Sequence, residues 1–209
     1  MNTRKLVWVP VCLGTLFSFG CVQAADTLIP PERLTSCAGL ATPPTVRVAT
    51  YNIKAGLESS LDEIGDVLES LNADIIALQE VDRNAERTGF VDQASALAER
   101  LGMDSAYAAT KRRGDGDFGI AILSRLPFAE IERIELPGAF SFEPRVALAA
   151  DVCLGDAPLR VFATHSDVNP MASEPQQKRI AELAVPYVGA GVLVTGDFNA
   201  TSGDPGLVA

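Results

Sequence analysis

The feature that most constrains this chain is a short apolar run at residues 191–199 that ends in a polar turn. Its sequence, Gly-Val-Leu-Val-Thr-Gly-Asp-Phe-Asn, predicts a buried strand that stops at Gly196. Such a run is typical of a central strand covered on both faces of a sheet. Asp197 and Asn199 flank Phe198, so an extended turn directs both polar side chains to one side. The turn is therefore either a catalytic pair or an Asx turn that satisfies loop backbone groups.

Each of four predicted strands carries polar side chains at or next to its carboxyl end. The strands are expected at residues 46–53, 74–78, 159–164 and 191–196. The polar residues are Asn52, Glu80, His165, and Asp197 with Asn199. Binding sites gather where strands end along one edge of a sandwich, so we expect these five side chains to lie together.

The order of helical and strand-like segments indicates an α/β fold. Helices are expected at residues 60–72, 93–101 and 174–187. Ser60 opens the first with a capping-box pattern, and Gly102 is the expected C-cap of the second. Strand-like runs that are joined by short turns, which favours antiparallel neighbours, lie at 128–136, 146–154 and 159–164. Helix-separated strands and hairpin-like strands together predict a sandwich of mixed sheets.

The first 24 residues have the layout of a secretory signal peptide. Two basic residues precede an apolar run at 6–19, and Ala24 supplies a small residue for cleavage. The run is too short to span a bilayer comfortably, although an uncleaved anchor is the alternative. We therefore expect a secreted or periplasmic protein with no membrane span after cleavage. Cys21 lies in a poor context for lipid attachment, so a lipoprotein is not expected.

Export sets the expected domain organisation and redox state. Residues 25–44 are rich in Pro, Thr and Ser and are predicted to form an exposed arm before a domain at 45–209. Cleavage would leave Cys37 and Cys153 as the mature cysteines, in a compartment where a disulfide persists. The sequence leaves open whether the two sulfur atoms meet.

The acidic balance of the chain bears on its substrate. The formal net charge is −10, and removal of two basic residues with the leader makes it −12, from 15 Lys and Arg against 27 Asp and Glu. Proteins that bind duplex DNA through phosphates usually have a basic face, so a small phosphoester or a lipid head group is favoured. The one dense basic cluster, residues 111–113, is expected in a solvated loop at 111–117.

Oxygen ligands from the strand ends suit a hard divalent cation such as Mg²⁺. Glu80 is the first-choice ligand, and Asn52 either adds its amide oxygen or holds the ligand carboxylate. Asp197 is placed to orient and deprotonate an attacking water. Asn199 is a donor for the oxygen that gains charge, and His165 a donor to a non-bridging phosphate oxygen.

Arg145 is a candidate contact for the substrate phosphate, with a solvated surface arginine as the alternative. Other chemistries lack their motifs. No G-x-x-x-x-G-K-[ST] or G-x-S-x-G pattern occurs, which disfavours a P-loop nucleotide hydrolase and a serine hydrolase. The single histidine in the sequence cannot supply a multi-histidine dimetal cage or a Cys/His zinc site.

Five short motifs resemble those of the endonuclease/exonuclease/phosphatase superfamily, in the same order. They are Ala-Thr-Tyr-Asn-Ile at 49–53, Ile-Ile-Ala-Leu-Gln-Glu-Val at 75–81, Ala-Ile-Leu-Ser-Arg at 121–125, Thr-His at 164–165, and Thr-Gly-Asp-Phe-Asn-Ala at 195–200. The resemblance covers residues 46–201. It implies a four-layered α/β sandwich and hydrolysis of a phosphoester that depends on Mg²⁺, with Mn²⁺ as the alternative ion.

The same resemblance implies roles for individual residues. Asn52 and Glu80 match metal-site positions, and His165 matches the histidine beside the phosphate. Asp197 and Asn199 match the pair that activates water and stabilises the transition state. Arg145 is similar to an arginine that precedes the corresponding strand in the family.

One departure from the family pattern concerns the end of the chain. Relatives continue after the Gly-Asp-Phe-Asn turn into a Ser-Asp-His motif, whereas this sequence stops at Ala209 and has one histidine. We therefore expect a C-terminally incomplete domain with impaired activity and an open sheet edge that invites self-association. The alternatives are a non-catalytic domain that binds metal or phosphate, and an enzyme that borrows the missing group from a partner chain.

Overall fold

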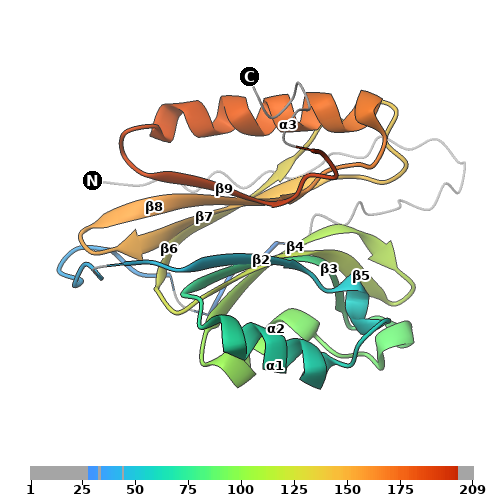
Figure 1. Cartoon of the computed structure of the whole chain (residues 1–209), viewed down its shortest axis with the longest axis horizontal. Coiled ribbons are helices and arrows are strands. Elements are labelled where there is room, and N and C mark those ends of the chain that lie inside the picture. Colours follow the sequence, from blue (N-terminus) through green and yellow to red (C-terminus); the bar gives the residue numbers. More distant parts are fainter. Residues whose placement is uncertain (1–27, 33, 44, 202–209) are drawn as a thin grey trace, which may run out of the picture.

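The structure, a computed structural model, describes residues 28–32, 34–43 and 45–201. Two β-sheets pack face to face, and helices cover the outer face of each sheet, which gives four layers (Figure 1). This arrangement confirms the predicted α/β sandwich of mixed sheets. The signal peptide predicted for residues 1–24 lies outside the described residues, as does the chain from residue 202 onward.

The first sheet has five strands in the order β1-β4-β5-β3-β2. They are β1 (Leu28–Ile29), β2 (Val48–Asn52), β3 (Ile75–Arg83), β4 (Asp104–Arg113) and β5 (Gly116–Ser124). β2 and β3 run parallel, whereas the other neighbouring pairs are antiparallel. The parallel pair requires a crossover, which helix α1 (Leu61–Leu71) supplies on the outer face.

The second sheet has four strands in the order β6-β7-β8-β9. They are β6 (Phe128–Glu135), β7 (Val146–Leu154), β8 (Ala157–His165) and β9 (Val192–Asp197). β6, β7 and β8 form an antiparallel meander, as predicted. The β7–β8 turn is short, whereas residues 136–145 form a longer connection between β6 and β7. β8 and β9 run parallel because helix α3 (Pro170–Ala184) carries the chain back over the sheet (Figure 1).

The helices covering the first sheet begin and end where the sequence predicted. The Ser60 hydroxyl accepts a hydrogen bond from the Glu63 amide at 3.2 Å, and the Glu63 carboxylate accepts one from the Ser60 amide at 2.8 Å. α1 ends at Asn72 in the left-handed conformation. Helix α2 (Gln93–Leu101) ends at Gly102, also left-handed. In the described part of the chain, no helix is long and apolar enough to cross a membrane.

α3 begins four residues earlier than the predicted start at residue 174. Asn169 caps it by accepting a hydrogen bond from the Met171 amide at 3.1 Å. Pro170 occupies the first helical position, where a missing N–H costs no hydrogen bond. After Ala184 the chain continues as a single 3-10 turn, Val185–Tyr187, which agrees with the predicted break near Pro186.

The core between the two sheets is built from side chains that alternate along the strands. Ile75 and Ile122 from the first sheet face Leu148 and Val161 from the second, all fully buried. Phe128 begins β6 and fills the same layer. Because each strand buries one set of alternate residues here and the other set under a helix, most central strands are apolar throughout.

The strand that leads into the Gly-Asp-Phe-Asn turn was expected in the centre of a sheet. Instead, β9 is the last strand of its sheet within the described residues, and Val194 is 36% exposed. An apolar run alone does not separate a central strand from an edge strand covered by a helix on one face. On the side of β9 away from β8, the backbone groups pair with no other strand among the described residues.

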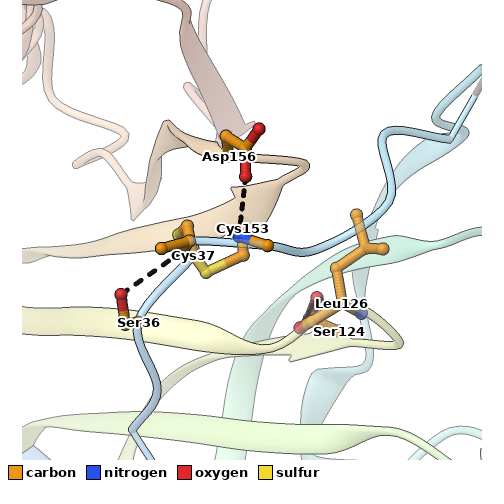
Figure 2. Close-up of a disulfide and its surroundings, with 8 residues drawn as sticks. Ser36, Cys37, Ser124, Leu126, Cys153 and Asp156 are labelled. Atoms are coloured by element: carbon orange, nitrogen blue, oxygen red, sulfur yellow. Dashed lines mark hydrogen bonds between the residues drawn. A yellow bond between two sulfur atoms is a disulfide. The ribbon is translucent and has the colours of Figure 1, made fainter.

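The segment at 25–44 was expected to be an exposed arm, and most of its described residues, 28–32 and 34–43, are exposed. It also makes contacts with the body of the domain. β1 pairs with β4, and Leu34 forms a bridge with Phe128. Cys37 and Cys153 form a disulfide with Cα atoms 5.0 Å apart (Figure 2). The partly buried Leu28 packs against the inter-sheet core, a contact that a Pro- and Thr-rich composition does not reveal.

Candidate functional site

The strand ends of both sheets meet on one side of the sandwich. In the parallel β2–β3 pair Asn52 lies opposite Gln79, next to Glu80. In the parallel β8–β9 pair His165 lies opposite Asp197. Because parallel neighbours end at the same edge, both pairs deliver polar groups to one cleft of about 530 Å³. All six predicted site residues line it: Asn52, Glu80, Arg145, His165, Asp197 and Asn199.

Glu80 reaches the cleft through an irregularity in β3. The pairing of β3 with β5 shifts register between Leu78 and Val81, and Glu80 has a φ of 56°. Such a β-bulge re-aims a side chain that regular pleating would direct elsewhere. A non-glycine residue with positive φ costs about 1–3 kcal/mol and persists where its surroundings hold it.

Asn52, which lines the cleft, joins the two sheets through hydrogen bonds. Its Nδ2 donates hydrogen bonds to Glu80 Oε1 at 2.8 Å and to Asp197 Oδ2 at 3.1 Å. Its Oδ1 accepts one from the Lys54 amide at 3.0 Å. Of the two roles considered for Asn52, this geometry corresponds to the one in which its amide holds the candidate ligand carboxylate.

Asp197 uses its two carboxylate oxygens differently. Oδ1 accepts a hydrogen bond from the Asn199 amide at 3.0 Å, which is an Asx turn. Oδ2 faces Asn52 and lies 3.9 Å from His165 Nε2. The Asx-turn alternative is therefore observed. The catalytic role of the pair stays a prediction, with Oδ2 as the oxygen left for it.

Gly196 sets the close approach of β9 to β8. Its φ is +149°, and a Cβ built on it would lie 2.1 Å from the Thr164 carbonyl oxygen. The small residue therefore allows Asp197 to pair with His165 across the two strands.

Asn199 serves mainly to hold the turn. Its Nδ2 donates to the Ser166 carbonyl at 2.9 Å, and its φ is 48°. The Ser166 amide in turn donates to the Asp197 carbonyl at 2.9 Å. Asn199 still lines the cleft, so its second amide hydrogen remains near the site.

His165 is almost fully buried, with 9% of its side chain exposed. Burial, and secondarily the nearby charge of Arg145, hold the pKa of its imidazole below the usual range, against the opposing effect of Asp197. The ring is therefore neutral at neutral pH and has one N–H to donate.

Asp167, which sequence analysis did not single out, anchors Arg145. Its carboxylate is fully buried and lies 3.9 Å from Arg145 Nε, a nitrogen without a hydrogen-bond partner among the described residues. Asp167 also accepts hydrogen bonds from the Ser141 hydroxyl at 2.7 Å and the Asn169 amide at 2.8 Å. Burial acts to raise the pKa of Asp167, but these donors and Arg145 outweigh it and hold the pKa below the ordinary value. The Asp-x-Asn spacing before α3 was the available sequence signal.

The basic cluster at 111–113 differs from the solvated loop that was expected. These residues end strand β4, and the turn to β5 is only two residues long. Lys111 forms an ion pair with Glu143 and lies 5.1 Å above the Phe118 ring. Lys111 and Arg113 both line the cleft, so the cluster contributes positive charge to its wall.

The carboxylate oxygens in the cleft are suitable ligands for a hard cation such as Mg²⁺. Glu80 and Asp197 offer carboxylate oxygens, and among the described residues no hydrogen bond engages Glu80 Oε2. Mg²⁺ commonly keeps several waters and takes one or two carboxylates, which matches this set. The described residues contain no group of three or more His, Cys, Asp or Glu side chains able to hold a metal, so a zinc-like protein cage does not fit.

A four-layered α/β sandwich with carboxylates, an imidazole and an arginine in one cleft defines a phosphoesterase-type hydrolase fold. Residues 49–208 match the endonuclease/exonuclease/phosphatase family, and the chain belongs to that family. This confirms the resemblance seen in the five motifs. The family comprises phosphoesterases and nucleases, which generally use a divalent metal. No curated protein matches the chain.

Solved structures share the fold at low sequence identity. A conserved protein of unknown function from Enterococcus faecalis V583 has a TM-score of 0.63 and 20% identity, over 78% of this chain and 70% of its own. An endonuclease/exonuclease/phosphatase from Beutenbergia cavernae has a TM-score of 0.59 and 24% identity, over 75% and 48%. A mannosyl-6-phosphatase from Bacteroides thetaiotaomicron has a TM-score of 0.61 and 17% identity, over 78% and 68%. The chain thus spans about half to about two thirds of their lengths.

Proposed function

We propose that this chain is a metal-dependent hydrolase of phosphoesters, cleaving a phosphodiester or a phosphomonoester by attack of water. The observation that carries the proposal is the Asn52 bridge between Glu80 and Asp197, because it brings the strand ends of two sheets into one polar cluster. His165 is buried and Arg145 is largely buried, and both line the same cleft. Membership of the family supports the reaction class.

In the proposed reaction, Asp197 accepts a proton from the attacking water through Oδ2. Asn52 keeps this oxygen in place by a hydrogen bond. His165, neutral because burial lowers its pKa, donates an N–H to a non-bridging phosphate oxygen. Arg145 stabilises the same phosphate by charge, with its guanidinium held by Asp167. Asn199 holds the turn that positions Asp197 and offers its remaining amide hydrogen to the substrate.

Mg²⁺, with Mn²⁺ as the alternative, is the cofactor that the donor set favours. Glu80 would hold the ion, and Asn52 would orient that carboxylate. When bound, the ion supplies charge stabilisation at a phosphoryl oxygen and lowers the pKa of a bound water.

The test of this function is hydrolysis of bis(p-nitrophenyl) phosphate by purified residues 25–209, with Mg²⁺ and with a chelator. We expect Mg²⁺-dependent turnover that falls about 10²–10⁴-fold in Asp197→Asn, because the variant keeps the Asx-turn acceptor but loses the base. Asp115→Asn, an exposed carboxylate outside the cleft, is the matched control. Unchanged turnover in Asp197→Asn would rule out this mechanism.

One observation favours a second candidate, a domain that binds phosphate and metal without turnover. The sequence contains a single histidine, His165, and the proposal already gives it the role of contacting the phosphate. The given sequence therefore offers no second imidazole that could protonate the departing oxygen. Magnesium and phosphate binding by a folded sample that hydrolyses nothing would select this function, and turnover only in an oligomer would indicate a group lent by a partner chain.

We also propose that the protein is exported to the periplasm or the exterior. We do not propose that it is a lipoprotein. The Cys37–Cys153 disulfide supports an oxidising compartment. The acidic net charge of −10 supports a small phosphoester or a lipid head group as substrate over duplex DNA.

A further inference from the structure

A buried glutamine connects the two segments that carry Asn52 and Glu80. Gln93 is the first residue of α2 and is 3% exposed. Its Nε2 donates a hydrogen bond to the Ala55 carbonyl at 2.7 Å, and its Oε1 accepts one from the Asp82 amide at 2.9 Å. Ala55 lies just after β2, and Asp82 lies in β3 two residues after Glu80. One side-chain amide therefore ties the chain that leaves β2 to the part of β3 beyond its bulge.

Both of the connected segments have backbone conformations that need support. Lys54 and Ala55 have φ values of 47° and 54°, and Glu80 has a φ of 56°. Non-glycine residues in this region are strained and persist where the surrounding contacts hold them. Ala55 is 1% exposed, so its carbonyl needs a donor from inside the fold. Gln93 supplies that donor.

The turn at residues 54–56 contacts Asn52 directly. The Lys54 amide donates a hydrogen bond to Asn52 Oδ1 at 3.0 Å, which fixes the orientation of the side-chain amide. Asn52 Nδ2 then faces Glu80 Oε1 at 2.8 Å and Asp197 Oδ2 at 3.1 Å. A displacement of this turn would therefore move the Asn52 donor away from both carboxylates.

The two backbone partners of Gln93 require a donor and an acceptor on one planar group. Ala55 presents a carbonyl oxygen and Asp82 presents an N–H. The glutamine amide satisfies both partners, whereas a carboxylate offers acceptors alone and a methionine of similar length offers no strong donor or acceptor. The contacts therefore depend on the amide itself and not only on the size of the side chain.

A second buried glutamine makes equivalent contacts in the other half of the site. Gln176 of α3 accepts a hydrogen bond from the Asp167 amide at 2.9 Å and donates one to the Pro137 carbonyl at 3.1 Å. Asp167 is the carboxylate that faces Arg145. Gln176 thus supports the arginine side of the cleft, whereas Gln93 supports the side that carries the candidate cation ligand.

We propose that Gln93 is a positioning residue for the divalent cation, because it holds the segments that place Asn52 and Glu80. Under the proposed function, on which this inference rests, Glu80 holds the ion and Asn52 orients its carboxylate. Gln93 is not among the residues that line the cleft, so it acts through the backbone of Ala55 and Asp82.

The test measures Mn²⁺ binding to the purified protein by titration calorimetry. Gln93→Met should weaken Mn²⁺ binding about tenfold, the lower end of the losses typical of residues that orient metal ligands. Gln176→Met is the matched control, because it also removes two hydrogen bonds from a buried glutamine but should bind Mn²⁺ as the wild type does. Urea unfolding should show that both variants are destabilised, so the difference in Mn²⁺ affinity reports positioning and not stability.

A second substitution keeps nearly the size of the side chain. Gln93→Glu retains an acceptor for the Asp82 amide but replaces the donor to the Ala55 carbonyl. It should also weaken Mn²⁺ binding, and it decides the test if circular dichroism shows that Gln93→Met is unfolded.

The outcomes separate this inference from the proposed function. Wild-type Mn²⁺ affinity in the folded Gln93 variant, or an equal loss in Gln176→Met, would overturn the positioning role and leave the cation site in place. A wild-type protein that binds no Mn²⁺, or binding that survives unchanged in Glu80→Gln, would overturn the proposed cation site and the positioning role with it.

Discussion

At the scale of single residues, the site depends on side chains that satisfy two demands at once. Asp197 closes an Asx turn with one oxygen and faces Asn52 with the other. Asp167 fixes Arg145 and also accepts hydrogen bonds from two loops. Such residues link the local conformation of a turn to the position of the side chains that line the cleft. Their replacement should therefore affect stability and, under the proposed function, activity.

Asp167→Asn should lower the free energy of unfolding by about 1–3 kcal/mol at pH 7, because a buried carboxylate with several donors is replaced by a neutral amide. The pKa of Asp167 is depressed in the folded state, so its contribution is present above the unfolded pKa of about 4. It is lost as the pH falls through the lower folded value. Urea unfolding at pH 7 and pH 3 should show a difference that narrows at the acidic pH.

The exposed Asp104→Asn provides the control for this measurement, and its stability should match that of the wild type at both pH values. A deficit of Asp167→Asn that is the same at pH 3 as at pH 7 would show that the carboxylate charge is not the cause.

At the scale of elements, short-range signals decide where the helices of the first sheet begin. The capping box of α1 satisfies backbone amides that would otherwise lack partners at the helix start. Ser60→Ala should therefore lower the free energy of unfolding by about 1 kcal/mol, measured by urea denaturation. Ser59→Ala removes a neighbouring exposed hydroxyl that caps no helix and should change stability little. Equal effects of the two substitutions would contradict the capping role.

At the scale of the whole molecule, a disulfide joins the N-terminal segment to β7, 116 residues away in sequence. If the chain is exported as proposed, the protein recovered from the exported fraction should begin at Ala25 and contain no free thiol. Intact mass measurement with and without alkylation under denaturing conditions checks both points. A mass that retains the leader, or two alkylated cysteines, would contradict the proposed route.

The sequence by itself determined the caps of α1 and α2, most of the strands and the candidate side chains that the fold brings into one cleft. Ser60, Gly102 and the apolar runs act through neighbours within a few residues, so their effects are visible in the letters. The alternation of helices with strands, and then of strands with short turns, was also enough to predict two mixed sheets in a sandwich.

Only the tertiary structure decided features that depend on partners distant in sequence. Among the described residues β9 is the last strand of its sheet, residues 28–29 pair with β4, and the cluster at 111–113 is part of a strand. Asp167 became a site residue only when folding placed it beside Arg145. The physical reason is that an apolar run must be buried and a buried carboxylate must accept hydrogen bonds, whatever the residues around them. Which residues provide those contacts depends on how the two sheets pack.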